Sequence, residues 1–532
     1  MNSETLAQGH PLRWKAMPFI ALAVSLIIMD ATVVNVAIPS MIRDLTLSAS
    51  DAEWINSIYS LVFAALLITV GRLGDLTGRR RLLLVGVIVF GLASVLASMA
   101  TSGTTLIGAR FLQGLGGAMV LPSTLSTVNA LFFGKERGIA FAIWGSTIGG
   151  MAAVGPVVGG WLTTVSTWRW AFLINIPITL IVIFGIIKFV PETRDPHAKK
   201  GADYSGVVLS IFGLGLIVFG LIEGIRFGWW KTQEVFTVVG FSWSSAISPV
   251  PVAFIVGLIS MVLFVFIERS RSEADKPVLL DLSLLKIRSF RFGSIAALVV
   301  SLGEFGMLFA LPLFVQGALG YTALRSGVLI LSLAIGTFLI SGATPQLTQR
   351  IGGRAVVRIG LAFEVIAIFG LGITINVSMA GWLVALWLFI YGLGVGMATA
   401  QLTSVILADV PVAQSGQASG LQSTFRQMGS AIGVALLGSL LVTNLGSKVI
   451  KNLAAVPGLD SATQSEVAKV VRGSAGTAIP QLSQLPGGEV LRHAGELAMT
   501  SAARFTTLVA AAVIFLGLLA TIALPAVVTH KE

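Results

Sequence analysis

Residues 113–119 read QGLGGAM, and the chain returns to nearly the same motif, YGLGVGM, at residues 391–397. Each copy lies inside a long apolar segment, where small residues let membrane helices approach closely. The same offset of 278 residues pairs Gly138 with Gly416, Ala140 with Ala418 and Gly155 with Gly433. The chain is therefore built from two related halves.

The composition places these halves in a membrane. The chain has 532 residues, of which 55% are hydrophobic and 11% charged, and its mean hydropathy is +0.91. Soluble domains carry about 25% charged residues. Apolar stretches of about 20 residues recur from end to end, and each is long enough to cross a hydrocarbon core of about 30 Å as a helix. We therefore predict an all-α polytopic membrane protein.

Fourteen spans fit the apolar pattern, as two six-span halves with two extra spans between them. They cover roughly 18–38, 54–73, 81–100, 104–128, 139–163, 169–190, 205–225, 250–268, 291–316, 326–345, 355–375, 382–406, 422–443 and 505–527. The predicted domains are an N-terminal six-helix bundle (1–190), two linking helices (191–290) and a C-terminal six-helix bundle (291–532) with an extracytoplasmic cap loop at about 444–504. Parallel halves of this kind are typical of transporters whose substrate site lies between them.

Basic residues decide the orientation. The formal net charge is +11, and the lysines and arginines concentrate in alternate loops, such as 79–81 and 269–291. The positive-inside rule places these loops and both termini in the cytoplasm, which predicts a multi-pass membrane protein; the family resemblance described below implies a bacterial inner membrane. This distribution argues against a nucleic-acid partner. The chain has no cysteine, and its four histidines lie outside the predicted spans, so we expect no metal site.

Several motifs at helix ends resemble the major facilitator superfamily. Residues 71–80, GRLGDLTGRR, are similar to its cytoplasmic loop GxLaDrxGrk, with Leu76 where a basic residue is usual. LIGARFLQGLGGAM (106–119) resembles the fourth-helix pattern of the superfamily. Three further segments resemble its fourteen-span drug:proton antiporters, which are bacterial multidrug efflux transporters: DATVVNVAIP (30–39), WRWAFLINIP (168–177) and GQASGLQSTFRQMG (416–429). The resemblance covers the whole chain and implies the major facilitator fold, with two pseudo-symmetric six-helix bundles and two extra central helices.

The loop at 71–80 has two interpretations. Gly71 and Gly78 permit a tight turn and close helix approach, and Asp75 can sit at a helix N-terminus, where backbone N–H groups favour an anion. The resemblance implies that these residues, with Arg79 and Arg80, form a latch that closes the cytoplasmic side. The alternative is a basic loop that only fixes topology. Asp75 favours the latch, because an acid adds nothing to a positive-inside signal.

Two opposite charges lie inside predicted spans. Asp30 lies about 12 Å from the outer end of the first span, and Arg110 lies about 9 Å into the fourth, at 1.5 Å per residue. A mid-membrane charge costs at least ~2.5–3.5 kcal/mol, so each should face the interior and have a partner. A carboxylate held between burial and a neighbouring arginine can load and release a proton. We predict proton coupling at this pair, with a static ion pair as the alternative. Leu388 stands at the equivalent of Arg110 in the second half, so this chemistry belongs to the first.

Other acids in the spans are candidates for a substrate cavity. Glu304 lies in LVVSLGEFGMLFALP; a glycine precedes it, and Phe305 and Met307 follow it. A carboxylate beside an aromatic ring suits an organic cation, so we predict a cavity role for Glu304, Phe305 and Met307, and a share of proton coupling for Glu304. The alternative is a protonated glutamate hydrogen-bonded to a neighbouring helix. Glu364 is either a second cavity acid or a contact to a helix end. Further cavity candidates, on helices that line the cavity in this superfamily, are Asn35, Phe141, Trp144 and Gln422.

The fifth span contains GPVVGG at 155–160, which resembles the antiporter motif, with Met151 at the position of its usual leading glycine. Gly155, Gly159 and Gly160 allow close helix packing, and Pro156 frees a backbone carbonyl and allows a kink. We interpret the motif as a flexible seam between the halves that seals against proton leak and, at the same time, as a site of tight packing.

The resemblance implies a proton-coupled antiporter that exports hydrophobic, often cationic drugs from the bacterial cytoplasm by alternating access. We expect no enzymatic activity and no cofactor, because no segment has the spacing of a phosphate-binding loop and a proton gradient can supply the energy. The expected partners are small-molecule substrates, protons and membrane lipids, and we expect a monomer. A second hypothesis is a dedicated exporter of one endogenous lipid, siderophore or antibiotic. A third is a non-transporting sensor, against which the intact motifs argue.

Overall fold

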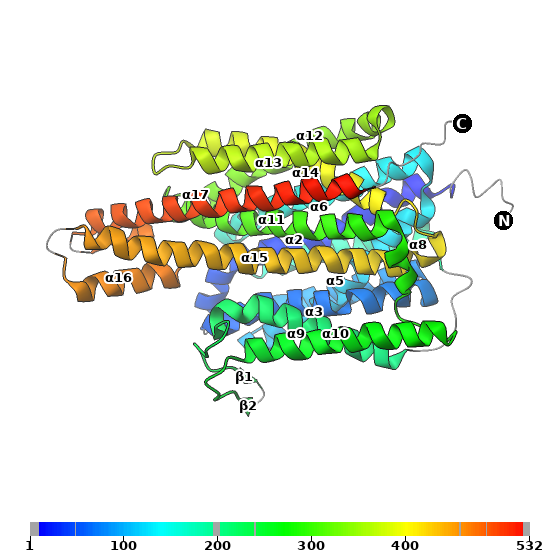
Figure 1. The fold of residues 1–532 in the computed structure, drawn as a ribbon, viewed down its shortest axis with the longest axis horizontal. Helices are drawn as coiled ribbons and strands as arrows, with labels where there is room; N and C mark the ends of the chain where they lie inside the picture. Colours follow the sequence, from blue (N-terminus) through cyan, green and yellow to red (C-terminus); the bar gives the residue numbers. More distant parts are fainter. Residues whose placement is uncertain are drawn as a thin grey trace.

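The structure is a computed structural model that describes residues 10–47, 49–194, 203–238, 241–456, 459–485 and 487–524. It is nearly all helical (Figure 1). The first half contains α2 (Arg13–Leu45), α3 (Ala49–Thr77), α4 (Arg79–Ser98), α5 (Gly103–Leu131), α6 (Gly134–Val165), α7 (Trp170–Leu173) and α8 (Asn175–Phe189). Between the halves lie α9 (Tyr204–Phe227), β1 (Thr237–Val238), β2 (Phe241–Ser242) and α10 (Pro249–Glu273). The second half contains η1 (Leu282–Lys286), α11 (Arg288–Gly317), α12 (Ala323–Ile351), α13 (Gly353–Thr374), α14 (Gly381–Ile406), η2 (Val412–Gln414), α15 (Ser415–Ala454), α16 (Ser461–Gly473), η3 (Ile479–Gln484), α17 (Gly488–Ala520) and η4 (Thr521–Ala523).

The prediction of a polytopic helical protein is confirmed. In the described part of the chain, thirteen helices are long and apolar enough to cross a membrane. They correspond to every predicted span except the fourth, α5, whose 29 residues pack against α3 and α4 and bury Arg110 and Gln113. A helix that turns polar side chains inward is less apolar on average, so the count of fourteen spans stays a prediction.

Two details differ from the expected helix pattern. The sixth span is assigned as the single turn α7 followed by α8, although Ile174 between them keeps a helical backbone with φ −59° and ψ −25°. The connection between α9 and α10 contains a short antiparallel hairpin, in which Thr237 pairs with Ser242. Strands this short are easily missed, because two residues give no alternating pattern.

Local sequence explains where several helices begin. Ser102 starts α5 with a capping box, in which the Thr105 N–H donates to Ser102 Oγ and the Ser102 N–H donates to Thr105 Oγ1. Asp460 caps α16 by accepting the Thr463 N–H at 3.0 Å. Between α3 and α4, Gly78 has a φ of 113°, which favours glycine and allows the sharp turn.

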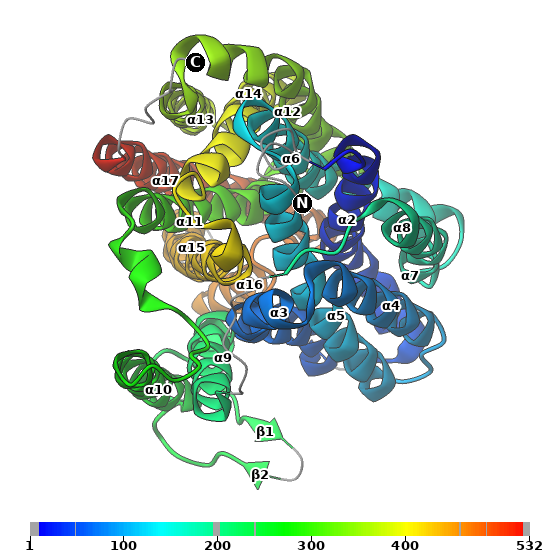
Figure 2. The ribbon, with the colours of Figure 1, turned by 90° about the vertical axis from the view of Figure 1, so that its right-hand side faces the viewer.

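The helix α6 joins the two halves. One of its faces packs against α2, and another packs against α12 and α14 of the second half. On the opposite side of the molecule, α3 packs against α15 (Figure 2). We call the end of the bundle where α2 begins and α17 ends the terminal face; it faces the viewer in Figure 2.

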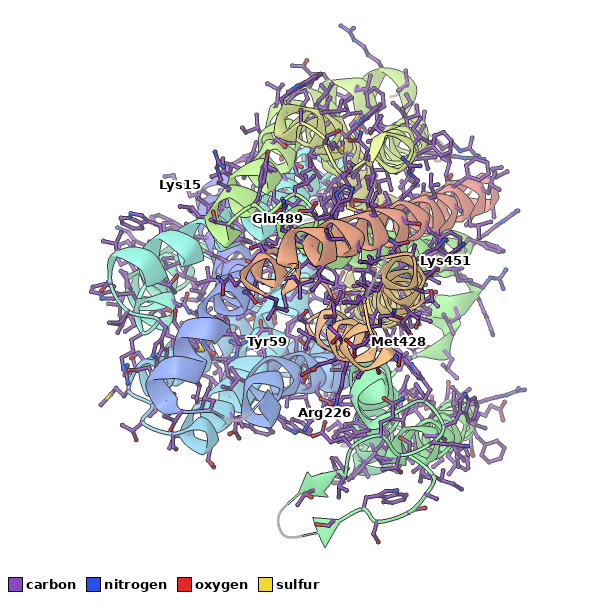
Figure 3. All side chains as sticks on the ribbon, turned by 90° about the vertical axis from the view of Figure 1, so that its left-hand side faces the viewer. Lys15, Tyr59, Arg226, Met428, Lys451 and Glu489 are labelled. Atoms are coloured by element: carbon purple, nitrogen blue, oxygen red, sulfur yellow. The ribbon has the colours of Figure 1, made fainter. Side chains whose placement is uncertain are left out.

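At the other end, α15 and α17 continue far beyond the bundle and form a cap with α16 and η3 (Figure 1). Figure 3 looks onto this end, with Lys451 on α15 and Glu489 on α17. The apolar core of the bundle continues into the cap through Leu445, Val449, Leu453, Val467, Val471, Ile479, Leu482, Leu491 and Ala498. The segment at 444–504, which the sequence predicts as a cap, is helical and consists of the ends of α15 and α17 with α16 and η3.

Candidate functional site

Asp30 is held by three side chains deep inside the first half. Its Oδ2 accepts a hydrogen bond from Arg110 Nη1 at 2.6 Å. Its Oδ1 accepts from Asn175 Nδ2 at 2.7 Å and from Gln113 Nε2 at 3.1 Å. Asp30 and Arg110 are both 0% exposed. A buried ion pair of this kind needs further hydrogen bonds to offset the desolvation of its charges, and the two amides supply them.

Arg110 has partners besides the carboxylate. Its Nη1 also donates to Gln113 Oε1 at 2.8 Å, and its Nε donates to the Ile55 carbonyl at 3.1 Å. The guanidinium carbon lies 4.3 Å from the centre of the Tyr59 ring, which is a cation–π geometry. These contacts tie α5 to α3 as well as to α2, so the arginine retains neighbours when the charge on Asp30 changes.

Asn175, Gln113 and Tyr59 were not among the candidates from sequence. Asn175 starts α8, and its amide reaches both Asp30 and Ser94 Oγ, the latter at 3.2 Å. Asn175 belongs to the segment WRWAFLINIP, and Gln113 belongs to QGLGGAM. The sequence analysis used both segments for the family resemblance and gave no role to these two side chains. For Asn175 and Gln113, a polar amide inside an apolar run was the available signal, and it is weaker than a charge; Tyr59 carried no such signal.

The glycines of GPVVGG press directly on the turn of α2 that carries Asp30. A Cβ at Gly159 would lie 2.9 Å from the Val33 carbonyl oxygen, and a Cβ at Gly155 would collide with Thr32. Pro156 lies on the other side, where its carbonyl carbon would lie 3.7 Å from a Cβ at Gly327 of α12. The motif thus joins the Asp30 helix to the second half of the protein. Gly160 belongs to the same stretch of α6.

A second charged cluster lies in the second half. Glu304 of α11 and Glu364 of α13 both interact electrostatically with Arg426 of α15. Both glutamates also interact electrostatically with Tyr391 of α14. Both glutamates are buried, and neither Glu364 oxygen has a hydrogen-bond partner among the described residues. Sequence analysis did not single out Arg426, although it lies in the segment GQASGLQSTFRQMG. An arginine among apolar residues, like Arg110, was the available signal.

Glu304 and Arg426 line a small cavity between α11, α14 and α15. It offers about 10 Å³ to the centre of a water-sized molecule, which is about what one water needs. Its wall also contains the hydroxyl groups of Ser301, Thr399 and Thr403, and the Gln422 amide, which has no hydrogen-bond partner in the described part of the chain. The walls therefore combine both charges with neutral hydrogen-bonding groups.

The other cavity candidates lie elsewhere. Phe141 and Trp144 are buried within the first half, where Trp144 Nε1 donates to Thr124 Oγ1 at 3.2 Å. Phe305 is half-buried and Met307 is buried, and neither lines the cavity beside Glu304. The backbone of Asn35 belongs to α2, but its side chain lies outside the described residues.

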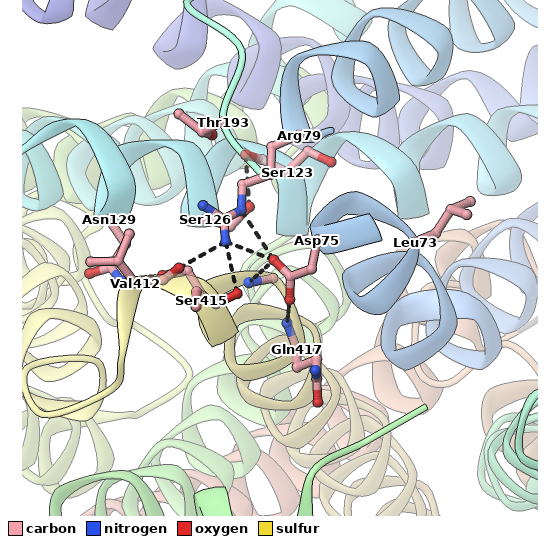
Figure 4. Close-up of polar contacts among 12 residues, drawn as sticks. Leu73, Asp75, Arg79, Ser123, Ser126, Asn129, Thr193, Val412, Ser415 and Gln417 are labelled. Atoms are coloured by element: carbon pink, nitrogen blue, oxygen red, sulfur yellow. Dashed lines mark hydrogen bonds and ion pairs between the residues drawn. The ribbon is translucent and has the colours of Figure 1, made fainter. Parts of the chain in front are cut away.

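At the terminal face, Asp75 binds the second half of the protein (Figure 4). Its two oxygens accept the Gly416 N–H at 2.8 Å and the Gln417 N–H at 2.9 Å, at the first turn of α15. Arg79 Nη2 donates to Asp75 Oδ1 at 2.7 Å and to the Val412 carbonyl at 2.9 Å. The carboxylate thus uses free N–H groups at a helix N-terminus, where an anion is favoured.

Two further contacts close the same face. Asn129 Nδ2 on α5 donates to Ser415 Oγ on α15 at 2.8 Å. A Cβ at Gly71 would lie only 2.5 Å from the Gly416 carbonyl oxygen, so α3 and α15 touch through their backbones. Close packing of this kind holds the two halves together at the terminal face.

Arg80 and Gly78 have a different role in the structure. Arg80 Nη2 donates to the Ile187 carbonyl of α8 at 2.6 Å, within the first half. Glu192 accepts the backbone N–H groups of Arg80 and Arg81 and so caps α4 beside Gly78. These residues organise the turn that carries Arg79, whereas Asp75 and Arg79 make the contacts between the halves.

Comparisons with known proteins agree with this architecture. The family model described as Major Facilitator Superfamily matches residues 20–434. A probable actinorhodin transporter of Streptomyces coelicolor is 35% identical over 445 residues, which are 82% of this chain and 74% of that protein. The multidrug efflux pump LfrA of Mycolicibacterium smegmatis is 34% identical over 442 residues, 82% of each chain. The crystal structure of the human organic anion transporter MFSD10 (TETRAN) shares the fold, with a TM-score of 0.57 and 13% identity over 96% of this chain and 100% of that one. This multi-pass membrane protein therefore belongs to the Major Facilitator Superfamily.

Proposed function

We propose that the protein exports hydrophobic, often cationic compounds from the bacterial cytoplasm in exchange for protons. The observation that carries the proposal is Asp30, a fully buried carboxylate held by Arg110 and two amides and pressed by the glycines of α6. An ionisable group in this setting is a functional site by default. The relatives named as a multidrug efflux pump and a probable actinorhodin transporter support export as the direction.

The proposed cycle is alternating access. The terminal face is cytoplasmic, as the basic loops at 79–81 and 269–291 indicate. In the described arrangement the latch between Asp75 and α15 is closed. Opening toward the outside would give Asp30 a proton, and opening toward the cytoplasm would release the proton and admit substrate. Because proton and substrate use opposite states of the same carrier, the two movements are coupled.

In the second half, we propose that the Glu304, Glu364 and Arg426 cluster holds a second exchangeable proton. If both acids were ionised, one arginine would leave a net negative charge in a buried site, which is costly. One proton shared by the two acids balances the cluster. In the described arrangement the cavity beside Glu304 has room for about one water, so a cationic substrate would need it to widen during the cycle. Once there, the substrate would replace that proton, because either one neutralises the excess charge.

A second candidate function is export of one endogenous product. It is favoured by relatives named for single compounds, such as the tetracenomycin C resistance and export protein of Streptomyces glaucescens, which is 28% identical over 92% of this chain and 86% of that protein. A dedicated exporter would move one compound class, whereas a multidrug exporter would move ethidium, tetracycline and puromycin alike. Competition among these compounds in one vesicle preparation separates the two functions.

The test of proton coupling uses ethidium and tetracycline efflux from cells with and without a protonophore. Export that survives the protonophore at the wild-type rate would overturn the proposal. Asp30→Asn and Glu304→Gln variants, measured beside the wild type, separate the two proposed proton sites.

A further inference from the structure

The two extra helices are connected to the cytoplasmic latch through residues 277–287, which we call the strap. The strap runs from the end of α10 to the start of α11 and contains η1 (Figure 2). Its Leu279, Leu280 and Leu284 are buried. A connecting segment that buries three leucines is a packed part of the structure rather than a loose linker.

The end of the strap next to α10 is fastened by Glu268. Its Oε2 accepts the backbone N–H groups of Leu279 at 3.0 Å and of Leu280 at 3.2 Å. Arg271 Nε donates to the Pro277 carbonyl at 3.0 Å. These bonds set the position of the strap relative to α10, because they fix its first backbone groups.

Asp281, the next residue of the strap, forms hydrogen bonds with residues at the start of α15, the helix that receives Asp75. The Asp281 N–H donates to Gln417 Oε1 at 2.7 Å, and Gln414 Nε2 donates to Asp281 Oδ2 at 2.8 Å. Gln417 thus joins two partners: its side chain accepts from the strap, and its backbone N–H donates to Asp75. The strap therefore holds the helix terminus that receives the latch carboxylate.

The extra helices are themselves attached to the first half. Along α9, the Ser210 and Thr69 hydroxyls are 3.4 Å apart, and the Phe219 ring stacks with Trp54 at 6.4 Å. The helix α10 packs along α9. Two connections between the halves therefore run side by side at the cytoplasmic face. One is the direct bond from Asp75 to α15, and the other passes through α9, α10 and the strap.

We propose that the strap is a second fastening of the cytoplasmic gate, in which Asp281 is a positioning residue that acts through Gln414 and Gln417 on the N-terminus of α15. The role rests on the proposed transport cycle, since it requires this face to open and close. Loss of the strap contact lets the start of α15 move away from Asp75, and the cytoplasmic gate then opens more often.

The test measures opening of the gate directly and needs no substrate. The chain has no cysteine, so Ser126→Cys on α5 gives a single thiol. Ser126 is 1% exposed and lies beside the latch (Figure 4). Its hydroxyl donates to the Ser123 carbonyl of its own helix, and among the described residues it has no hydrogen bond to another helix. A membrane-impermeant maleimide added to the cytoplasmic side of inside-out vesicles then labels this thiol at a rate set by opening.

In the S126C chain, Gln417→Ala and Asp281→Ala each remove one hydrogen bond between the strap and the start of α15, and Asp281→Ala also removes the bond from the Ser283 N–H within the strap. Each variant should speed labelling about three- to tenfold, the range for loss of one hydrogen bond between the strap and the start of α15. Gln417→Ala keeps the N–H that binds Asp75, so its effect isolates the strap contact.

Asp281→Ala removes the bond from Gln414 and keeps the backbone N–H that donates to Gln417, whereas Gln417→Ala removes the latter bond. The double variant cuts both bonds and should therefore label faster than either single variant. Glu273→Gln is the matched control: an exposed acid that pairs with Arg269 and should label at the background rate.

Unchanged labelling in both Asp281→Ala and Gln417→Ala, with folded protein by gel filtration, would overturn the strap proposal. Asp75→Asn tests the latch separately, because it removes the ion pair to Arg79 while leaving Asp281 and Gln417 in place. A response to the strap variants without a response to Asp75→Asn would refute the latch and retain the strap. Drug export enters neither readout, so failure of the export proposal is distinguishable.

Discussion

Asp30→Asn tests the proposed coupling site most sharply, because it removes the charge and keeps the shape. Arg110 would then be buried without its counter-charge, and breaking one side of a buried pair costs about 3–5 kcal/mol. Arg110 keeps Gln113 at 2.8 Å and the Ile55 carbonyl at 3.1 Å, so we expect a loss near the lower end, about 3 kcal/mol.

This cost of about 3 kcal/mol can be compared with the free energy that a proton gradient supplies in one transport cycle. A proton crossing about 100 mV releases about 2.3 kcal/mol, and one pH unit adds about 1.4 kcal/mol. A bacterial proton gradient is therefore of the same size as the cost of leaving Arg110 without its counter-charge, as the proposed coupling at Asp30 requires. Asparagine resembles a permanently protonated aspartate, so the variant should exchange substrate down its own gradient but not against it.

The assay uses purified protein in liposomes with an imposed pH gradient. We expect wild-type protein to accumulate ethidium against its gradient, and Asp30→Asn to fall to the level of protein-free liposomes while still allowing downhill efflux. Asp44→Asn, in the same helix, is the control: its ion pair with Arg169 is exposed and worth little. Uphill transport by Asp30→Asn at the wild-type rate, abolished by a protonophore, would refute the assignment of coupling to Asp30.

Three further expectations concern the neighbours of these sites. Asn175→Ala removes a donor 2.7 Å from Asp30 and should lower the free energy of unfolding by about 1–3 kcal/mol in a denaturant titration; a midpoint equal to the wild type would contradict a structural share in the site. Gly159→Ala places a Cβ 2.9 Å from the Val33 carbonyl oxygen and should reduce folded yield and export, whereas Gly108→Ala, whose Cβ meets no described atom within 4 Å, should do neither. Arg426→Leu leaves Glu304 and Glu364 without their cation and should destabilise the protein by about 3 kcal/mol; adding Glu304→Gln should restore part of that loss, and purely additive effects would argue against a coupled cluster.

Charged residues of the site could be predicted from the sequence more readily than uncharged polar residues. Asp30 and Arg110 stand out because a charge in an apolar helix is costly and needs a partner. Asn175 and Tyr59 do not, since an uncharged polar residue in a span is tolerated at lower cost, and its direction depends on helix rotation. Rotation and tilt come from packing, which sequence periodicity does not fix.

Long-range partners were also beyond the sequence. The loop at 71–80 predicted an anion at a helix N-terminus, but the N–H groups that receive Asp75 belong to Gly416 and Gln417 in the other half of the chain. Nothing in a single sequence marks free backbone N–H groups as the partner of one particular acid. The same holds for the cavity candidates. The sequence suggested Trp144 as a ligand contact, but in the structure its Nε1 donates to Thr124 within the first half.

The length of α15 has a mechanical consequence. This single helix of 40 residues begins at the latch and ends in the cap, which is about 60 Å at 1.5 Å per residue. A tilt of about 10° at the latch would displace the far end by about 10 Å over that length. The cap is thus a lever arm that turns a small rotation inside the membrane into a large movement outside it. A probe attached there, or an antibody fragment that clamps α15 to α17, would read or arrest the transport cycle without touching the drug pathway.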